Sequence, residues 1–189
     1  GNVGAATSSG ATIAADTVSV TDVKAGTGAL SVAADAGGIM IGTGQAGTTA
    51  MVQASAPAAA NGTVAITTSL TSGGAATVSA TGAASGGTVR SNTAGVTITG
   101  ATVNFTRLES AQALSVTASG GDATIGSAMA GGATMLTARD VVRSGAVTAA
   151  GQTVTIAITA RATTVGSHTN TATVTGGGGR ETNPADNVD

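Results

Sequence analysis

The side chains that this chain lacks already exclude several classes of protein. Its 189 residues contain no Cys, Trp or Tyr, one Phe and two Pro, and only 8% of them are charged. An average globular domain has roughly 25% charged residues. A metal site built from Cys and His is excluded, because the chain has no Cys and a single His, His168.

The low charge also bears on partners. The net charge is −2, and the seven basic residues are scattered along the chain, so we expect no nucleic-acid interface. Thr, Ser or Gly interrupts every apolar run after a few residues, and we therefore expect no transmembrane segment. A positive mean hydropathy of +0.33 argues against disorder. We expect a folded chain whose core consists of Val, Ile, Leu and Ala.

Short segments in which Val or Ile alternates with Thr or Ser dominate the sequence. Gly and β-branched residues interrupt every window long enough for a helix, and residues 36–89 carry no charge that a solvent-facing helix would need. The alternating segments are typical of strands with one buried and one exposed face. We predict an all-β protein with strands at 17–21, 30–32, 63–67, 76–81, 96–99, 101–106, 153–159 and 171–175.

The chain contains an internal repeat. The segment 29–54 aligns without a gap on the segment 113–138, and 12 of the 26 aligned positions are identical. Apolar residues that are infrequent in this sequence stay in register, which chance does not readily explain in so biased a composition. The matched pairs include Leu30 with Leu114, Ile41 with Ile125 and Met51 with Met135.

Within each copy, apolar residues recur at about 21 positions, as from Leu30 to Met51, and four such intervals make the 84-residue offset between the copies. Short strands at this interval with glycines at the corners predict a parallel β-helix, or β-solenoid, of about 20–21 residues per coil. We assign these coils to residues 1–148. The alternative is one or more antiparallel Ig-like β-sandwich domains.

The segment "ALSVTASGGDATIGSAMAGGATMLTARDVVRSGAVTAAGQTVTI", residues 113–156, resembles the repeats of filamentous-haemagglutinin-type adhesins and autotransporter passengers. The resemblance implies a secreted β-helical shaft that binds surfaces, other cells or polysaccharide. Residues 149–189 are similar to the end of an Ig-like repeat of large bacterial surface proteins. This second resemblance is carried by Asn170, Ala172 and Val174 in a strand and by Asn183, Pro184 and Asn187 in an acidic tail.

The stretch "GIMIGTGQAG", residues 38–47, contains a G-x-G-x-x-G pattern after an apolar run. In a dinucleotide site such a loop is followed by a helix and, about 20 residues on, by an acid. No Asp or Glu occurs between Asp35 and Glu109, and the residues after the loop are too broken for that helix. The repeat copy replaces the middle glycine by Ala128. We therefore interpret the glycines as corners of coils.

Catalytic and metal sites are poorly supported. His168 stands in "VGSHTNTATV" with no G-x-S-x-G motif elsewhere in the chain, so we predict that the protein is not an enzyme. Calcium is the one cofactor we consider, and acidic residues in turns more often cap the backbone than bind an ion. The weak calcium candidates are Asp16, Asp22, Asp186 and Asp189.

Thr-x-Thr pairs raise the question of ice binding, since ranks of Thr on a flat solenoid can bind ice. The pairs stand at 97–99, 153–155, 169–171 and 171–173. They do not recur once per coil in the sequence, so we interpret them as ordinary exposed strand residues.

These observations favour a non-enzymatic structural protein outside the cell or on a bacterial cell surface: a shaft or filament-forming segment of an adhesin, such as biofilms contain. Its expected partner is a further copy of itself, joined through exposed strand edges or through a C-terminal strand donated beyond Gly176–Gly179. A host surface or polysaccharide is a further expected partner. The alternative is a β-helix protein that binds or cleaves polysaccharide.

Overall fold

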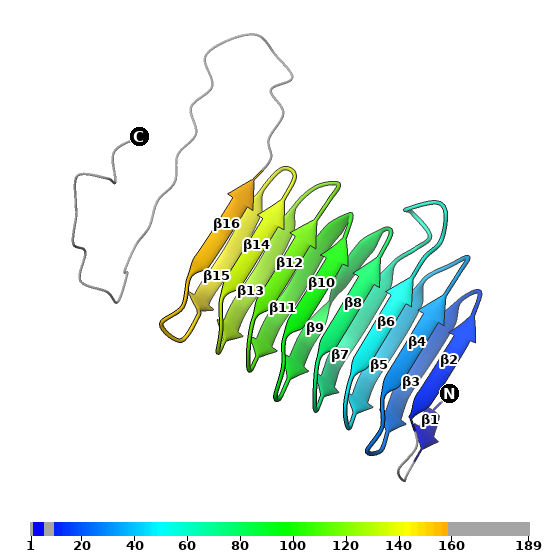
Figure 1. Cartoon of the computed structure of the whole chain (residues 1–189). Helices are drawn as coiled ribbons and strands as arrows, with labels where there is room; N and C mark the ends of the chain where they lie inside the picture. Colours follow the sequence, from blue (N-terminus) through cyan, green and yellow to red (C-terminus); the bar gives the residue numbers. More distant parts are fainter. Residues whose placement is uncertain (1, 6–9, 159–189) are drawn as a thin grey trace, which may run out of the picture.

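The protein is a parallel β-solenoid in the computed structural model, which describes residues 2–5 and 10–158 (Figure 1). Every described residue in regular structure belongs to a strand, and the chain alternates between two eight-stranded sheets as it winds. All strand pairs in this part of the chain are parallel, which confirms the predicted all-β solenoid. The antiparallel sandwich alternative is wrong for the same residues.

The odd-numbered strands form the first sheet. In order they are β1 (Asn2–Ala5), β3 (Val18–Ala25), β5 (Ile39–Ala46), β7 (Val64–Ser72), β9 (Ala83–Ser91), β11 (Thr102–Ser110), β13 (Ala123–Ala130) and β15 (Val142–Thr148).

The even-numbered strands form the second sheet, which we call the even sheet. They are β2 (Ala11–Ala15), β4 (Leu30–Ala34), β6 (Ala50–Ala54), β8 (Ala76–Ala80), β10 (Val96–Gly100), β12 (Leu114–Ala118), β14 (Thr134–Ala138) and β16 (Val154–Ile158). The last of these lies beyond residue 148, so the coils continue at least to Ile158. Residues 159–189, with the rest of the segment that resembles an Ig-like repeat, lie outside the described residues.

The coils differ in length around the predicted value. In the even sheet the shortest coil leads from Val96 to its register partner Leu114, and the longest leads from Ala50 to Ala76. The longest coil contains the loop at 55–63 between β6 and β7, visible as the largest loop of Figure 1. Extra residues are tolerated there because they leave the stack at a corner and do not disturb the strand pairing.

The 84-residue repeat corresponds to four coils. Leu30 begins β4 and Leu114 begins β12, four strands further along the even sheet, and both side chains are buried. The predicted interval from Leu30 to Met51 is one residue too long. Leu30 pairs with Ala50, while Met51 points outward and is 44% exposed. A shift of one position moves a strand side chain from the core to the surface.

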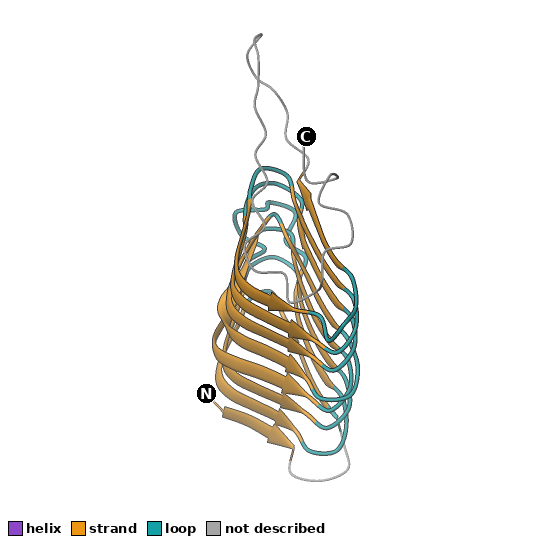
Figure 2. Ribbon diagram, turned by 90° about the vertical axis from the view of Figure 1, so that its left-hand side faces the viewer, coloured by secondary structure: helices purple, strands orange, loops and turns teal. Residues whose placement is uncertain are grey.

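Most strands of the first sheet bend in the middle. In β5 the side chains alternate in and out until Gly42 and Thr43, two successive residues that do not point inward, and the alternation then resumes in the opposite phase. The same change of phase occurs in β3, β11 and β13. Each such strand therefore has two arms, and with the even strand the coil has three sides around one core (Figure 2).

Stacked aliphatic side chains fill this core. In the even sheet, Val32, Val52 and Val78 follow one another in register with no exposed surface. Burying such a side chain contributes about 1.5–3 kcal/mol each. None of the described elements is a helix with the length and hydropathy to cross a membrane.

Candidate functional site

The glycines of the G-x-G-x-x-G stretch lie at a bend and a corner of the coil and form no phosphate-binding loop. A Cβ on Gly42 would lie 2.2 Å from the carbonyl oxygen of Thr21 in the preceding coil, and one on Gly126 would lie 2.4 Å from that of Thr106. Such distances are shorter than any real Cβ contact. Both glycines are therefore required by the close approach of two backbones.

The middle residue of the motif has a different role. Gly44 is buried and points into the core, where a Cβ would lie 2.6 Å from Cδ1 of Leu70 in the next coil. Its counterpart in the repeat, Ala128, is also buried and lies in register with Leu108. A small residue in one coil thus makes room for a leucine in its neighbour, which explains why the two copies differ only at this glycine of the three.

The sequence-predicted site residues are not brought together in the described part of the chain. Asp16 lies in the turn after β2 with its side chain exposed, and Asp22 lies exposed on β3. The described residues contain no group of three or more His, Asp or Glu side chains placed to hold a metal ion. His168, Asp186 and Asp189 lie outside the described residues, so calcium binding by these candidates stays a prediction.

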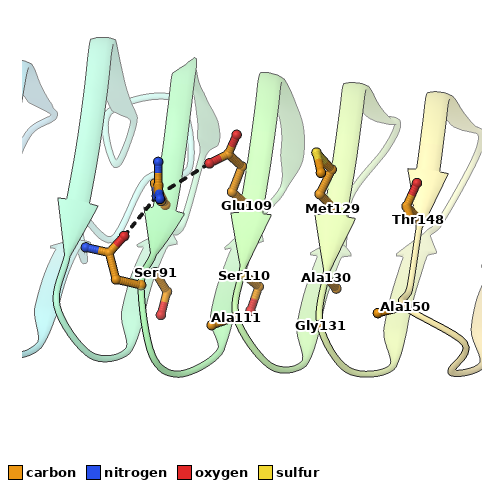
Figure 3. Close-up of a pocket in the computed structure, with 11 residues that line it drawn as sticks. Ser91, Glu109, Ser110, Ala111, Met129, Ala130, Gly131, Thr148 and Ala150 are labelled. Atoms are coloured by element: carbon orange, nitrogen blue, oxygen red, sulfur yellow. Dashed lines mark hydrogen bonds and ion pairs between the residues drawn. The ribbon is translucent and has the colours of Figure 1, made fainter.

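A shallow groove runs across the ends of β9, β11, β13 and β15, and we call it the edge groove (Figure 3). The side chains along it come from four successive coils at the same place in each coil. It is lined by Arg90, Ser91, Asn92, Glu109, Ser110, Ala111, Met129, Ala130, Gly131, Thr148 and Ala150.

A carboxylate between two guanidinium groups gives the edge groove its charge. Glu109 stands opposite Arg90 in the ladder, with Arg90 Nε 3.5 Å from Glu109 Oε2, and it pairs with Arg107 two positions before it on the same strand. Arg90 Nε also donates to Oδ1 of Asn92 at 2.8 Å. Arg107 Nη2 lies 3.7 Å from Sδ of Met129 in the next coil. The cluster of Glu109 and the two arginines carries a net charge of +1.

Beneath the groove lies a stack of three buried serines. Ser72, Ser91 and Ser110 occupy the same inward position in β7, β9 and β11. Their hydroxyls bind the corner loops: Ser72 and Ser91 donate to the carbonyl of Gly74 at 2.6 and 2.7 Å, and Ser110 donates to that of Ala113 at 2.8 Å. This stack was not predicted from the sequence, although its signal is simple, since the three serines are evenly spaced along the chain.

The edge groove and its rim provide one carboxylate and two guanidinium groups for binding a ligand. Glycoside hydrolysis ordinarily uses a pair of carboxylates, and Glu109 is the only acidic residue that lines the groove. Asp122, at the opposite end of β13 from the groove, is paired with Arg143 at 2.6 Å. The arrangement therefore suits binding of a polar or anionic group better than cleavage of a glycosidic bond.

No protein-family model, curated protein or solved structure matches this chain.

Proposed function

We propose that this chain is a non-enzymatic structural segment, a shaft of a bacterial surface adhesin-like protein that extends by stacking coils end to end. The resemblance of residues 113–156 to adhesin repeats supports this, as does the regularity of the stack. In such a protein each coil spans about 4.8 Å along the axis, and the number of coils sets the reach. The proposal includes secretion to the cell surface.

One observation carries the proposal: apolar core positions of the last described coil are exposed at that end of the described stack. Val154 and Ile156 continue the inward columns of Thr134 and Leu136, yet they are 40% and 52% exposed, while Leu136 is fully buried. An in-register parallel edge with apolar core positions is a template for a further coil. A second copy, or further coils of a longer protein, would extend the stack there.

The test uses the full chain. Small-angle scattering and negative-stain electron microscopy over a range of protein concentrations should show rods that lengthen by end-to-end association. Ile156→Lys places a charge in the exposed core column and should abolish lengthening, while Gln152→Lys, an exposed turn residue before the same strand, should leave it unchanged. Particles of a single length at every concentration would contradict the proposal.

The edge groove favours a second candidate, polysaccharide binding without cleavage. Guanidinium groups such as those of Arg90 and Arg107 bind carboxylates and sulfates of acidic polysaccharides well. Retention on a glycan array that is lost in Arg90→Ala and kept in Asn104→Ala, on the same sheet outside the groove, would support it. Release of reducing ends that is lost in Glu109→Gln would instead make the protein an enzyme.

A further inference from the structure

The outer face of the even sheet carries no charge. Its strands place sixteen side chains outward, two from each strand, and all are Thr, Ser, Ala, Met or Gln. The first rank comprises Thr12, Ser31, Met51, Thr77, Thr97, Ser115, Met135 and Thr155. The second rank comprises Ala14, Ala33, Gln53, Ser79, Thr99, Thr117, Thr137 and Ala157.

The first sheet differs sharply. Six charged side chains lie on its strands: Asp22, Lys24, Arg90, Arg107, Glu109 and Arg143. The strands of the even sheet carry none, and Asp16, Asp35 and Arg139 lie just beyond the ends of β2, β4 and β14. An uncharged face across eight strands is unusual for a solvated surface, because charged residues are what protects exposed sheets from association.

Hydroxyl side chains recur once per coil in the middle strands of the even sheet, although Thr-x-Thr pairs as such do not. Thr77 and Ser79 of β8, Thr97 and Thr99 of β10, and Ser115 and Thr117 of β12 lie in register. Figure 1 shows the strand arrows of this sheet keeping nearly one direction. Flat sheets of many strands are ordinarily stabilised by stacking against another layer.

The first rank also has an internal symmetry. From β6 to β14 it reads Met51, Thr77, Thr97, Ser115 and Met135, which is nearly the same in both directions about Thr97. The two methionines are 44% and 46% exposed. When a second copy faces this rank with its solenoid axis reversed, similar side chains therefore lie opposite one another.

We propose that the even sheet is a lateral interface between two copies of this chain, packed face to face and antiparallel about a two-fold axis that runs along β10 at Thr97. This axis brings Met51 of one copy against Met135 of the other. The first rank of one copy then faces the first rank of the other, and the second rank faces the second. Small uncharged side chains that meet across such an interface let the two sheets approach closely. The flexible methionines fill the space that smaller neighbours leave.

The area is sufficient for a specific contact. With the axis at β10, seven strands of each copy, β4 to β16, face their counterparts. At ~4.8 Å between strands and ~3.3 Å per residue, the shared face measures roughly 34 by 17 Å, or about 570 Å² per copy. The total of about 1,100 Å² lies at the lower limit for a specific interface, so the dimer is a weak one that repeated coils would strengthen.

The absence of Cys permits a direct test of this geometry in the full chain. Thr97→Cys, on the two-fold axis, should cross-link to itself with a short bismaleimide. Gln53→Cys alone should not, because its copies stand four strands apart, about 19 Å, but a mixture with Thr137→Cys should cross-link. Equal cross-linking of every single variant, or none at all, would overturn the proposal.

Sedimentation provides the second measurement. The full chain should dimerise reversibly, and Thr97→Lys should weaken the dimer at least about tenfold, because two like charges then face each other on the axis. The matched control is Asn104→Lys, an exposed outward residue of β11 on the first sheet, which should leave the dimer unchanged. A dimer that survives Thr97→Lys would contradict the interface.

This interface is separate from end-to-end stacking, and the two are distinguished by their variants. Ile156→Lys tests the end of the stack and Thr97→Lys the lateral face. A protein that stays monomeric but produces thermal hysteresis would assign the even sheet to ice, and one that stays monomeric and co-sediments with microcrystalline cellulose would assign it to a polysaccharide surface. Either result would overturn the lateral dimer and leave the shaft proposal standing.

Discussion

Phe105, the only aromatic residue of the chain, lies directly opposite Gly86 in the ladder between β9 and β11. Its ring is 1% exposed. A Cβ on Gly86 would lie 2.3 Å from the carbonyl oxygen of Ile66, so this coil has no room for a side chain there. The core accommodates one large ring because the adjacent coil contributes no side chain at the same position.

Phe105→Ala should destabilise the protein by about 3–5 kcal/mol, because it removes the largest fully buried side chain and leaves a cavity beside Gly86. Phe105→Leu, which fills part of the space, should cost less. Urea unfolding of both variants measures the difference, with exposed Thr106→Ala as the control. Equal midpoints for Phe105→Ala and the control would show that the ring is not packed as described.

The two glycines Gly42 and Gly44 should respond differently to alanine. Gly42→Ala forces a Cβ against backbone and should cost about 1–3 kcal/mol. Gly44→Ala meets first the end of the Leu70 side chain and also reduces the entropy of the unfolded chain, so its effect should lie within about 1 kcal/mol of zero. Thermal unfolding of the pair tests the distinction, and the reverse order of stabilities would refute it.

Thr134→Val should stabilise the protein. Thr134 is 1% exposed, and its Oγ1 has no hydrogen-bond partner among the described residues. Valine has nearly the same shape, so the substitution removes a buried unsatisfied hydroxyl at a gain of about 1–3 kcal/mol. Chemical denaturation measures the gain, and a loss of stability would indicate that the hydroxyl has a partner.

Ser91→Ala should have the opposite sign, with a loss of about 1–3 kcal/mol. Its buried hydroxyl donates to the carbonyl of Gly74 and accepts from the amide of Ala94, and the variant would leave that amide without the hydroxyl. Hydrogen exchange should become faster at the amide of Ala94 in particular. Unchanged exchange there would remove the serine stack from the interactions that fix the corner loops.

Glu109→Gln should change the free energy of unfolding by less than about 1 kcal/mol, because the ion pairs with Arg90 and Arg107 involve guanidinium groups that are half exposed. The wild-type protein should likewise lose little stability in high salt. Urea unfolding with and without salt measures both effects. A loss of several kcal/mol would show that the cluster supports the fold and is not available for a ligand.

Prediction from sequence succeeded where side chains alternate and failed where small residues or bends interrupt the alternation. The strands beginning at Val18, Leu30 and Val96 were predicted close to their observed positions. Strand β9 was missed, because its sequence "AASGGTVRS" contains two glycines that suggest a turn. Both glycines lie inside a strand, where the backbone of the preceding coil leaves no space for a Cβ. The sequence of one strand does not show how closely the backbone of the next coil approaches it.

The edge groove was not predicted from the sequence. The acidic residues considered there were Asp16 and Asp22, whereas Arg90 and Glu109, which belong to successive coils and are adjacent in space, were not considered. A residue's neighbour on the next coil depends on the length of each coil, and these lengths are unequal. If every coil is assumed to have the same number of residues, the predicted register is soon wrong by one position. An error of one position exchanges inward-facing and outward-facing residues.

The sequence by itself determined that this protein is a stack of β-coils around an aliphatic core. Alternation, glycine spacing and the internal repeat are local or periodic properties, and the hydrophobic effect converts them into a buried column. Only the tertiary structure decided the register. It alone placed Phe105 beside Gly86, gathered three serines beneath the edge groove and separated a charged sheet from an uncharged one, because these relationships depend on which residue of one coil lies above which residue of the next.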